Sequence, residues 1–163
     1  MTKHESRLAK EIQISTLTLD QLHKRLYRFY ELESEWMSTR QPGWNEEQFC
    51  RELPGKWELS FVAEVDDLIV GYVIGSRDKN NKYLSRVNKI VIDRNYHRQG
   101  IGRALMNQYF EASLRQSVTK FELKAMSDYS PANDLYISLG YTRLSKVKGK
   151  DGEIRNVYVK TIE

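Results

Sequence analysis

The sequence has little cysteine, few histidines and no long apolar run. Its single cysteine, Cys50, excludes an intramolecular disulfide and fits a reducing compartment. The three histidines, His4, His23 and His97, are far apart and show no metal-ligand spacing, so we expect no metal site. The longest apolar stretch, residues 68–74, is far shorter than the ~20 residues of a membrane helix. The N-terminus also lacks the apolar core of a signal peptide, and we therefore expect a cytoplasmic protein without a membrane partner.

The composition is that of one soluble globular domain. The chain has 163 residues, of which 40% are hydrophobic, 29% charged and 11% aromatic, and this content argues against a disordered protein. The net charge of +4 mildly favours an anionic partner, either a nucleic acid or a small ligand that carries phosphate. We expect residues 1–10 to form a flexible charged tail and residues 11–163 to form a single domain.

Hydrophobic spacing and turn residues predict an alternation of strands and helices. Thr18 offers an N-cap with Gln21 three residues later, Pro42-Gly43 breaks the chain, and Asp66-Asp67 marks a hairpin. The expected strands lie at 12–14, 57–65, 68–76, 83–92, 121–126, 141–147 and 154–162, and the expected helices begin after Thr18 and at 45, 100 and 130. A strand–helix–strand unit at 90–126 implies parallel pairing there, and the hairpins imply antiparallel pairing elsewhere. We therefore predict an α/β (α+β) fold with three α/β/α layers around a central mixed β-sheet of about seven strands.

A glycine-rich turn follows the strand that ends at residue 92. Gly100 and Gly102 stand at the start of a helix, where backbone N–H groups lack partners and carry partial positive charge. Both glycines leave room for an anion, and Arg98 and Arg103 add charge. The pattern predicts a backbone cradle for a pyrophosphate. The alternative is a tight turn whose glycines serve packing. Neither the dinucleotide fingerprint GxGxxG nor a Walker sequence is present to decide between the two.

Two motifs in this order resemble those of the GNAT acyl-CoA N-acyltransferases. The family pattern Arg/Gln-x-x-Gly-x-Gly/Ala after a strand is matched by Ile90, Val91, Ile92, His97, Arg98, Gln99, Gly100, Ile101 and Gly102. The family helix Asn-x-x-Ala-x-x-Leu-Tyr-x-x-Leu-Gly-Phe is matched by residues 129–141, which contain Ala132 and Tyr136. Two positions depart from the patterns: His97 replaces Arg or Gln, and Tyr129 replaces Asn. Asn133 could supply the lost side-chain contact from the same helix.

The resemblance implies a three-layer GNAT-like fold and direct transfer of an acetyl group from acetyl-CoA to an amine, without a metal. It assigns the donor to Ile90, Val91, Ile92, His97, Arg98, Gln99, Gly100, Ile101, Gly102, Arg103, Tyr129, Ala132 and Asn133. A backbone N–H of the strand at 90–92 would stabilise the oxyanion, and the pantetheine arm would add to the same strand edge.

Tyr136 is the general acid that the resemblance implies for the departing thiolate. A free thiol has a pKa of about 8.5 and tyrosine one of about 10, so complete proton transfer is uphill by about 2 kcal/mol. We therefore expect either a shared hydrogen bond or a locally lowered tyrosine pKa. By position alone, Tyr136 would instead be a core aromatic on an amphipathic helix.

The acceptor amine is not specified by the sequence. An acidic and aromatic group in the first two helices suits a cationic amine; it consists of Glu33, Glu35, Trp36, Trp44, Glu46 and Glu47. Lys89 and Lys124 favour an anionic acceptor instead. Lys124 also stands where some GNAT enzymes that acetylate protein N-termini carry a glutamate, which argues against an enzyme of that kind. Glu122 lies two residues earlier on the same strand face.

Two other functions compete with the enzyme. A catalytically weak, acyl-CoA-binding regulatory module would keep the fold and lose the chemistry. An RNA-binding domain would use the basic run 86–103, but that run contains only one aromatic residue, Tyr96, for stacking, so we expect no nucleic-acid partner. We expect a monomer or a homodimer.

Overall fold

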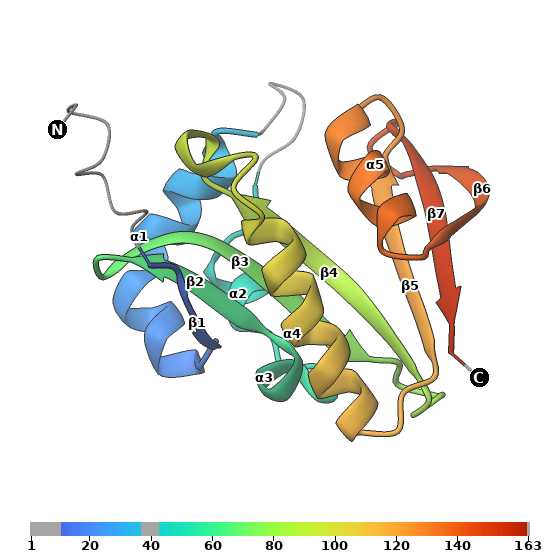
Figure 1. The fold of residues 1–163 in the computed structure, drawn as a ribbon, viewed down its shortest axis with the longest axis horizontal. Helices are drawn as coiled ribbons and strands as arrows, with labels where there is room; N and C mark the ends of the chain where they lie inside the picture. The colour runs from blue at the N-terminus through green and yellow to red at the C-terminus, as the bar shows by residue number, and fades with distance from the viewer. Residues whose placement is uncertain (1–10, 37–42, 163) are drawn as a thin grey trace, which may run out of the picture.

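The computed structural model describes residues 11–36 and 43–162, which form a seven-stranded mixed sheet between layers of helices (Figure 1). The strands are β1 (Gln13–Thr16), β2 (Phe61–Val65), β3 (Leu68–Arg77), β4 (Leu84–Ile92), β5 (Lys120–Met126), β6 (Thr142–Lys148) and β7 (Ile154–Thr161). The helices are α1 (Leu19–Ser34), α2 (Glu46–Cys50), α3 (Lys56–Leu59), α4 (Ile101–Arg115), α5 (Ser130–Ser138) and the 3-10 turn η1 (Arg94–Tyr96). The expected tail and Pro42 lie outside the described residues.

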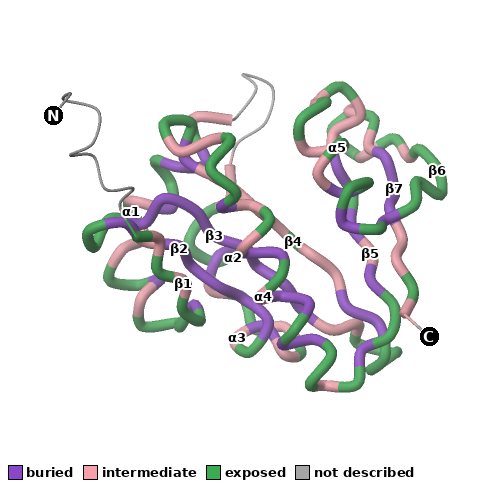
Figure 2. The backbone as a smooth tube through the Cα atoms, in the orientation of Figure 1, coloured by how far each residue is buried: buried purple, intermediate pink, exposed green. Residues whose placement is uncertain are grey.

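The sheet order β1-β2-β3-β4-β5-β7-β6 confirms the predicted mixed α/β architecture. Strand β4 pairs with β5 in parallel, and every other neighbouring pair is antiparallel. Two hydrophobic cores lie on opposite faces of the sheet: α4 and α5 contribute to one core, and α1 and α2 contribute to the other. Buried residues concentrate along β2 and β3, whereas β6 is mostly exposed (Figure 2).

The predicted turn and capping signals hold where the structure describes them. The Gln21 backbone N–H donates to Thr18 Oγ1 at 3.1 Å, and the Thr18 N–H donates to Gln21 Oε1 at 3.1 Å, which completes the capping box. Asp66 and Asp67 both take a positive φ in the β2–β3 hairpin. These short-range signals therefore fix where α1 begins and where the first hairpin turns.

One predicted boundary is wrong. The strand expected from residue 57 begins at Phe61, because Lys56–Leu59 form the short helix α3. Gly55 precedes it with a φ of 69°. The buried Lys56 ammonium donates to the carbonyls of Phe49 at 2.6 Å and Arg51 at 2.7 Å, and burial lowers its pKa. The contacts of this lysine with residues five and seven positions earlier stabilise the short helix and outweigh the strand-like pattern.

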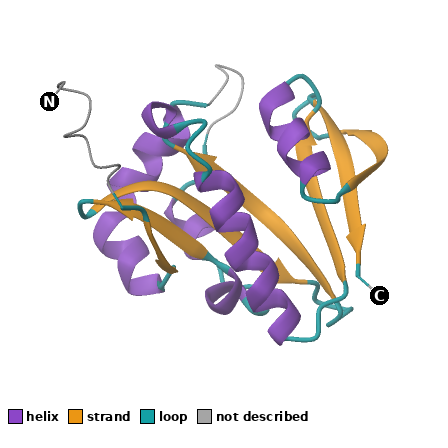
Figure 3. Cartoon of the chain, viewed as in Figure 1, coloured by secondary structure: helices purple, strands orange, loops and turns teal. Residues whose placement is uncertain are grey.

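Strands β4 and β5 diverge soon after they meet. Their register pairs Leu84 with Lys120 and ends at Arg86 with Glu122, although β4 runs on to Ile92. Strand β5 instead pairs with β7 from residue 120 to 126 (Figure 3). Within the described residues, the far end of β4 therefore has an edge without a strand neighbour. None of the described helices is long and apolar enough to cross a membrane.

Candidate functional site

At the unpaired edge of β4, alternate residues present their backbone N–H and C=O groups to the open side. The Asp93 N–H donates to the Val70 carbonyl at 2.8 Å, and the register pairs Val91 with Tyr72. Because antiparallel pairing alternates along a strand, Val91 faces β3, whereas Ile90 and Ile92 direct their N–H and C=O groups to the open side. The strand therefore offers two N–H donors and two carbonyl acceptors that no strand within residues 11–36 and 43–162 uses.

The start of α4 has the features of an anion site. Gly100 is its N-cap with a φ of 79° and no side-chain cap, and a Cβ added there would meet nothing within 4 Å. The Ala104 N–H makes the first bond of the helix, to the Gly100 carbonyl, so the three preceding N–H groups lie before the hydrogen-bond ladder. Arg98 and Gln99 are exposed beside them. An anion that approaches this turn would therefore meet both the free backbone N–H groups and the positive charge of Arg98.

Gly102 serves packing, the alternative that the sequence left open. A Cβ added there would lie 3.3 Å from Leu135 Cδ2 and 3.9 Å from Ile92 Cγ1. Arg103 of α4 also donates to the hydroxyl of Ser138 on α5 at 2.7 Å. The small residue thus lets α5 lie against the start of α4, which brings the two sequence motifs together.

Tyr136 lies buried between these elements. Its ring is 6.0 Å from that of Tyr141 and 5.8 Å from that of Tyr158, and it belongs to the core beneath α4 and α5. Burial raises the pKa of its hydroxyl well above the usual value, with smaller contributions from Tyr158 and Tyr129. The expectation of a locally lowered pKa is therefore wrong, and the Tyr136 hydroxyl keeps its proton at physiological pH.

Asn133 braces the first turn of α5. Its amide nitrogen donates to the carbonyls of Met126 at 2.9 Å and Tyr129 at 2.6 Å. Its amide oxygen accepts from Asn156 at 3.0 Å and from the Tyr158 hydroxyl at 2.5 Å. Because both ends of the amide are engaged, Asn133 holds α5 to β5 and β7 in this structure. Ala132, one residue earlier, packs half-buried against the core of α4 and α5.

Three aromatic side chains, Trp36, His97 and Tyr129, form a cluster at the end of β4 that has diverged from β5. The Trp36 indole N–H donates to the Ile92 carbonyl at 3.0 Å, and His97 Nε2 lies 3.2 Å from the same oxygen. The Trp36 ring stacks on His97 at 4.7 Å and lies 5.6 Å from Tyr129. The Arg94 guanidinium lies 4.8 Å from the Trp36 ring centre. Both departures from the family motifs, at residues 97 and 129, thus contact the same tryptophan.

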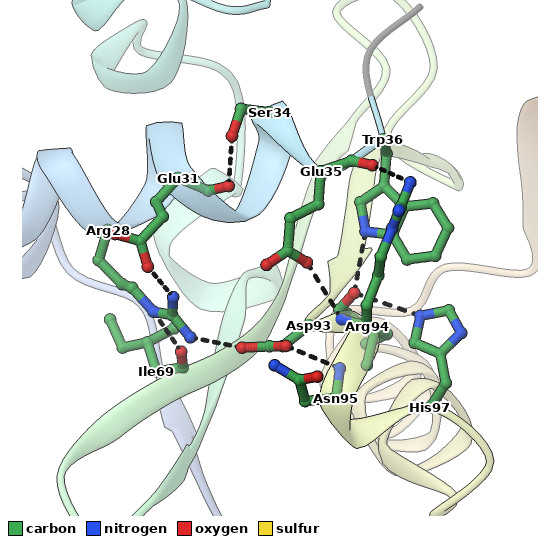
Figure 4. A network of polar contacts seen from close by, with 11 residues as sticks. Arg28, Glu31, Ser34, Glu35, Trp36, Ile69, Asp93, Arg94, Asn95 and His97 are labelled. Carbon is green, nitrogen blue, oxygen red and sulfur yellow. Dashed lines mark hydrogen bonds and ion pairs between the residues drawn. The ribbon is translucent and has the colours of Figure 1, made fainter.

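A buried ion pair anchors α1 beside this cluster (Figure 4). Arg28 donates to Asp93 at 2.7 Å and to the Ile69 carbonyl at 2.8 Å. Asp93 also accepts from the Asn95 N–H at 2.9 Å and so caps η1. The pair is not evident from sequence motifs, and the position of Asp93 directly after β4 is the one available signal. The pair fixes the turn from which the glycine loop continues.

Glu33 of the acidic group and Lys89, which favoured opposite acceptors, form an ion pair. Glu33 Oε1 accepts from Lys89 at 2.8 Å and from the Trp44 N–H at 2.6 Å, and the ammonium lies 4.5 Å from the Trp44 ring centre. Burial lowers the Lys89 pKa, and Glu33 opposes that shift. Glu35 accepts from the Arg94 N–H, whereas Lys124 is exposed. The Glu33–Lys89 pair therefore compensates one charge of each kind, and Glu46, Glu47 and Lys124 remain exposed.

A family profile and several known proteins match this chain, among them the following three proteins. The sequence profile of the acetyltransferase (GNAT) domain matches residues 56–143. N-alpha-acetyltransferase 30 of Dictyostelium discoideum is 29% identical over 92 residues, which are 55% of this chain and 49% of that protein, so the match spans about half of the relative's length. Ard1 from Thermoplasma volcanium has a similar fold, with a TM-score of 0.79, 17% identity and coverage of 93% of this chain and 98% of that one. The putative acetyltransferase yncA from Salmonella typhimurium, solved with its cofactor acetyl-CoA, has a TM-score of 0.72, 13% identity and coverage of 93% and 94%.

Proposed function

Because this chain belongs to the acetyltransferase (GNAT) family, we propose that it transfers an acetyl group from acetyl-CoA directly to an amine. One observation supports the proposal most strongly. The unpaired edge of β4 ends beside the start of α4, which has no side-chain cap. The backbone groups of β4 that could pair with an extended amide chain are therefore next to the N–H groups of α4 that could bind a diphosphate. A pantetheine diphosphate carries both groups in that order.

The chain's backbone would bind most of the donor. The N–H and C=O groups of Ile90 and Ile92 would pair with the pantetheine amides as an added strand does. The N–H groups of Ile101, Gly102 and Arg103 would bind the diphosphate, with Arg98 beside them. The Ile92 carbonyl already accepts from Trp36 and His97, so its pairing with a pantetheine amide would require one of those contacts to yield.

The reaction needs stabilisation of charge and a route for one proton. The amine lone pair attacks the thioester carbon, and a backbone N–H of Ile90 or Ile92 would stabilise the negative charge on the carbonyl oxygen. Such a donor typically contributes ~10²–10³ in rate. The C–S bond then breaks, and Tyr136 would donate a hydrogen bond to the leaving thiolate. The raised pKa of Tyr136 favours this shared hydrogen bond over complete transfer, and the amine proton leaves to solvent.

The acceptor is proposed as an amine of a small molecule or of a peptide or protein. The name of the Dictyostelium relative makes peptide α-amines the first class to assay, and Lys124, which replaces the glutamate of some such enzymes, makes lysine and polyamine acceptors the necessary comparison. A peptide with a free N-terminus, its N-blocked counterpart with a free lysine, and a polyamine distinguish these classes. A regulatory acyl-CoA-binding module is the alternative, and it predicts donor binding without thiol release in the presence of any of these amines.

The test is thermal unfolding with acetyl-CoA, with ATP as an anion control. At 100 times Kd the donor stabilises by ~2.7 kcal/mol, which is roughly 5–10 °C in Tm for a chain of this length. We expect that shift with acetyl-CoA and little with ATP. Absence of a shift at millimolar acetyl-CoA would contradict the proposal.

A pair of variants locates the binding. Gly100→Asp places a negative charge in the cradle, and Gly152→Asp is its matched control, because Gly152 has a φ of 82° and nothing within 4 Å of an added Cβ. Both substitutions carry similar backbone strain. We expect Gly100→Asp alone to weaken acetyl-CoA binding by about tenfold or more, which corresponds to about 1.4 kcal/mol. Equal affinities in the two variants would place the diphosphate elsewhere.

A further inference from the structure

A cluster of three different metal-ligating side chains joins α1 to α2. His23 comes from the second turn of α1, and Glu46 and Cys50 stand four residues apart on α2, so both face the same side of that helix. One ligand atom from each of the three lies within 4.8 Å of the other two. His23 is more than twenty residues from Glu46 and Cys50 in the chain, so no short metal-ligand motif predicts this cluster.

The spacing of the cluster is close to that of a zinc site. The His23 Nδ1 and Glu46 Oε1 atoms are 3.5 Å apart. Two such ligands at about 2.0–2.1 Å from a tetrahedral zinc lie about 3.4 Å apart, and a thiolate at about 2.3 Å lies about 3.6 Å from either. His23 and Glu46 are exposed and Cys50 is half-buried, so changes of side-chain rotamer can close the remaining distance.

We propose that the chain binds one zinc ion through the His23 imidazole, the Glu46 carboxylate and the Cys50 sulfur, with water as the fourth ligand. The mixture of nitrogen, oxygen and sulfur ligands suits zinc and disfavours magnesium and calcium, which take oxygen ligands. On binding, a zinc–sulfur bond forms and the Cys50 thiol releases its proton to solvent. The site is independent of the donor cradle, since none of its residues belongs to that cradle.

The ion would cross-link a helix that is too short to be stable alone. Helix α2 has five residues, far below the length at which isolated helices persist. Its Phe49 is fully buried in the core with Phe29 and Tyr72, so the position of α2 affects that core. A link from α2 to α1 adds to the packing that already holds them together. Zinc therefore raises the stability of the folded chain.

Cobalt(II) titration of the full chain without an affinity tag tests the site. We expect a sulfur-to-cobalt charge-transfer band that saturates at one cobalt per chain and is displaced by zinc, but not by magnesium. His23→Gln and Glu46→Gln should each weaken cobalt binding by at least tenfold, and Cys50→Ser should abolish the band. Glu47→Gln is the matched control, because Glu47 is the exposed neighbour of Glu46 on α2 and lies outside the cluster, so its affinity should equal that of the wild type.

Thermal unfolding gives a second readout that does not depend on the cobalt absorption band. Zinc at 100 times its Kd should raise Tm by roughly 5 °C or more in the wild type and in Glu47→Gln, and by little in His23→Gln. Absence of the band, a band that persists at full affinity in His23→Gln and Glu46→Gln, or saturation at half a cobalt per chain would each overturn the proposal. The last result would show a metal shared between two chains. Circular dichroism of each variant establishes that it is folded.

Discussion

Replacing Arg28 with methionine removes one half of the ion pair that fixes α1 to the turn after β4. The Arg28 side chain is 16% exposed and the Asp93 side chain 6%, so the substitution leaves a buried carboxylate without its cation. Removal of one partner of a buried pair costs about 3–5 kcal/mol. Because Arg28 is partly exposed and water can reach the vacated position, we expect the lower limit, about 3 kcal/mol. For a chain of this length that loss lowers Tm by roughly 6–12 °C.

The same helix supplies the control. Lys24 pairs with Asp20 at 2.9 Å, but these side chains are 73% and 71% exposed, so Lys24→Met should cost less than about 0.5 kcal/mol. Urea unfolding of both variants measures the difference. Adding Asp93→Asn to Arg28→Met removes the unpaired charge, so the double variant should lose less stability than the sum of the single variants. Equal losses for Arg28→Met and Lys24→Met would refute the reasoning.

Two further predictions concern the site and the core. Tyr136→Phe should lower turnover by ~10²-fold in a thiol-release assay and leave acetyl-CoA binding nearly unchanged, because only the hydroxyl is lost; unchanged turnover would exclude Tyr136 as the donor to the thiolate. Gly75→Ala should destabilise the chain by roughly 1–3 kcal/mol in urea unfolding, because its Cβ would lie 2.6 Å from the Tyr109 ring and 2.9 Å from the Leu59 carbonyl oxygen; a neutral result would mean that α3 and α4 can move apart.

Local signals in the sequence predicted most of the fold. The Thr18–Gln21 capping box, the Asp66-Asp67 hairpin and the glycines around α4 act over a few residues, and the structure shows each of them. The site was predicted less completely, because its supporting contacts join distant segments. Arg28 and Asp93 are 65 residues apart in the chain, and no periodicity relates them.

Contacts between distant segments also explain why the sequence did not predict the Glu33–Lys89 pair or the proposed zinc ligands. Glu33 and Lys89 indicated opposite acceptors when each was considered alone, and only their contact in the fold reveals that they neutralise each other. His23 has no histidine or cysteine near it in the sequence, yet α2 brings Glu46 and Cys50 beside it. Short-range patterns therefore predict helices, strands and turns, whereas charge compensation depends on tertiary packing.

The short register shared by β4 and β5 has a mechanical consequence. The sheet consists of two groups of strands, β1 to β4 and β5 to β7, joined by the short parallel pairing (called the spine below) that ends at Arg86 and Glu122. Rotation about that spine breaks few backbone hydrogen bonds, whereas bending within either group breaks many. The Trp36–Tyr129 contact and the approach of Leu135 to Gly102 lie across the open side, where a small rotation produces the largest displacement. The separation between the far ends of β4 and β5 therefore depends on these two contacts.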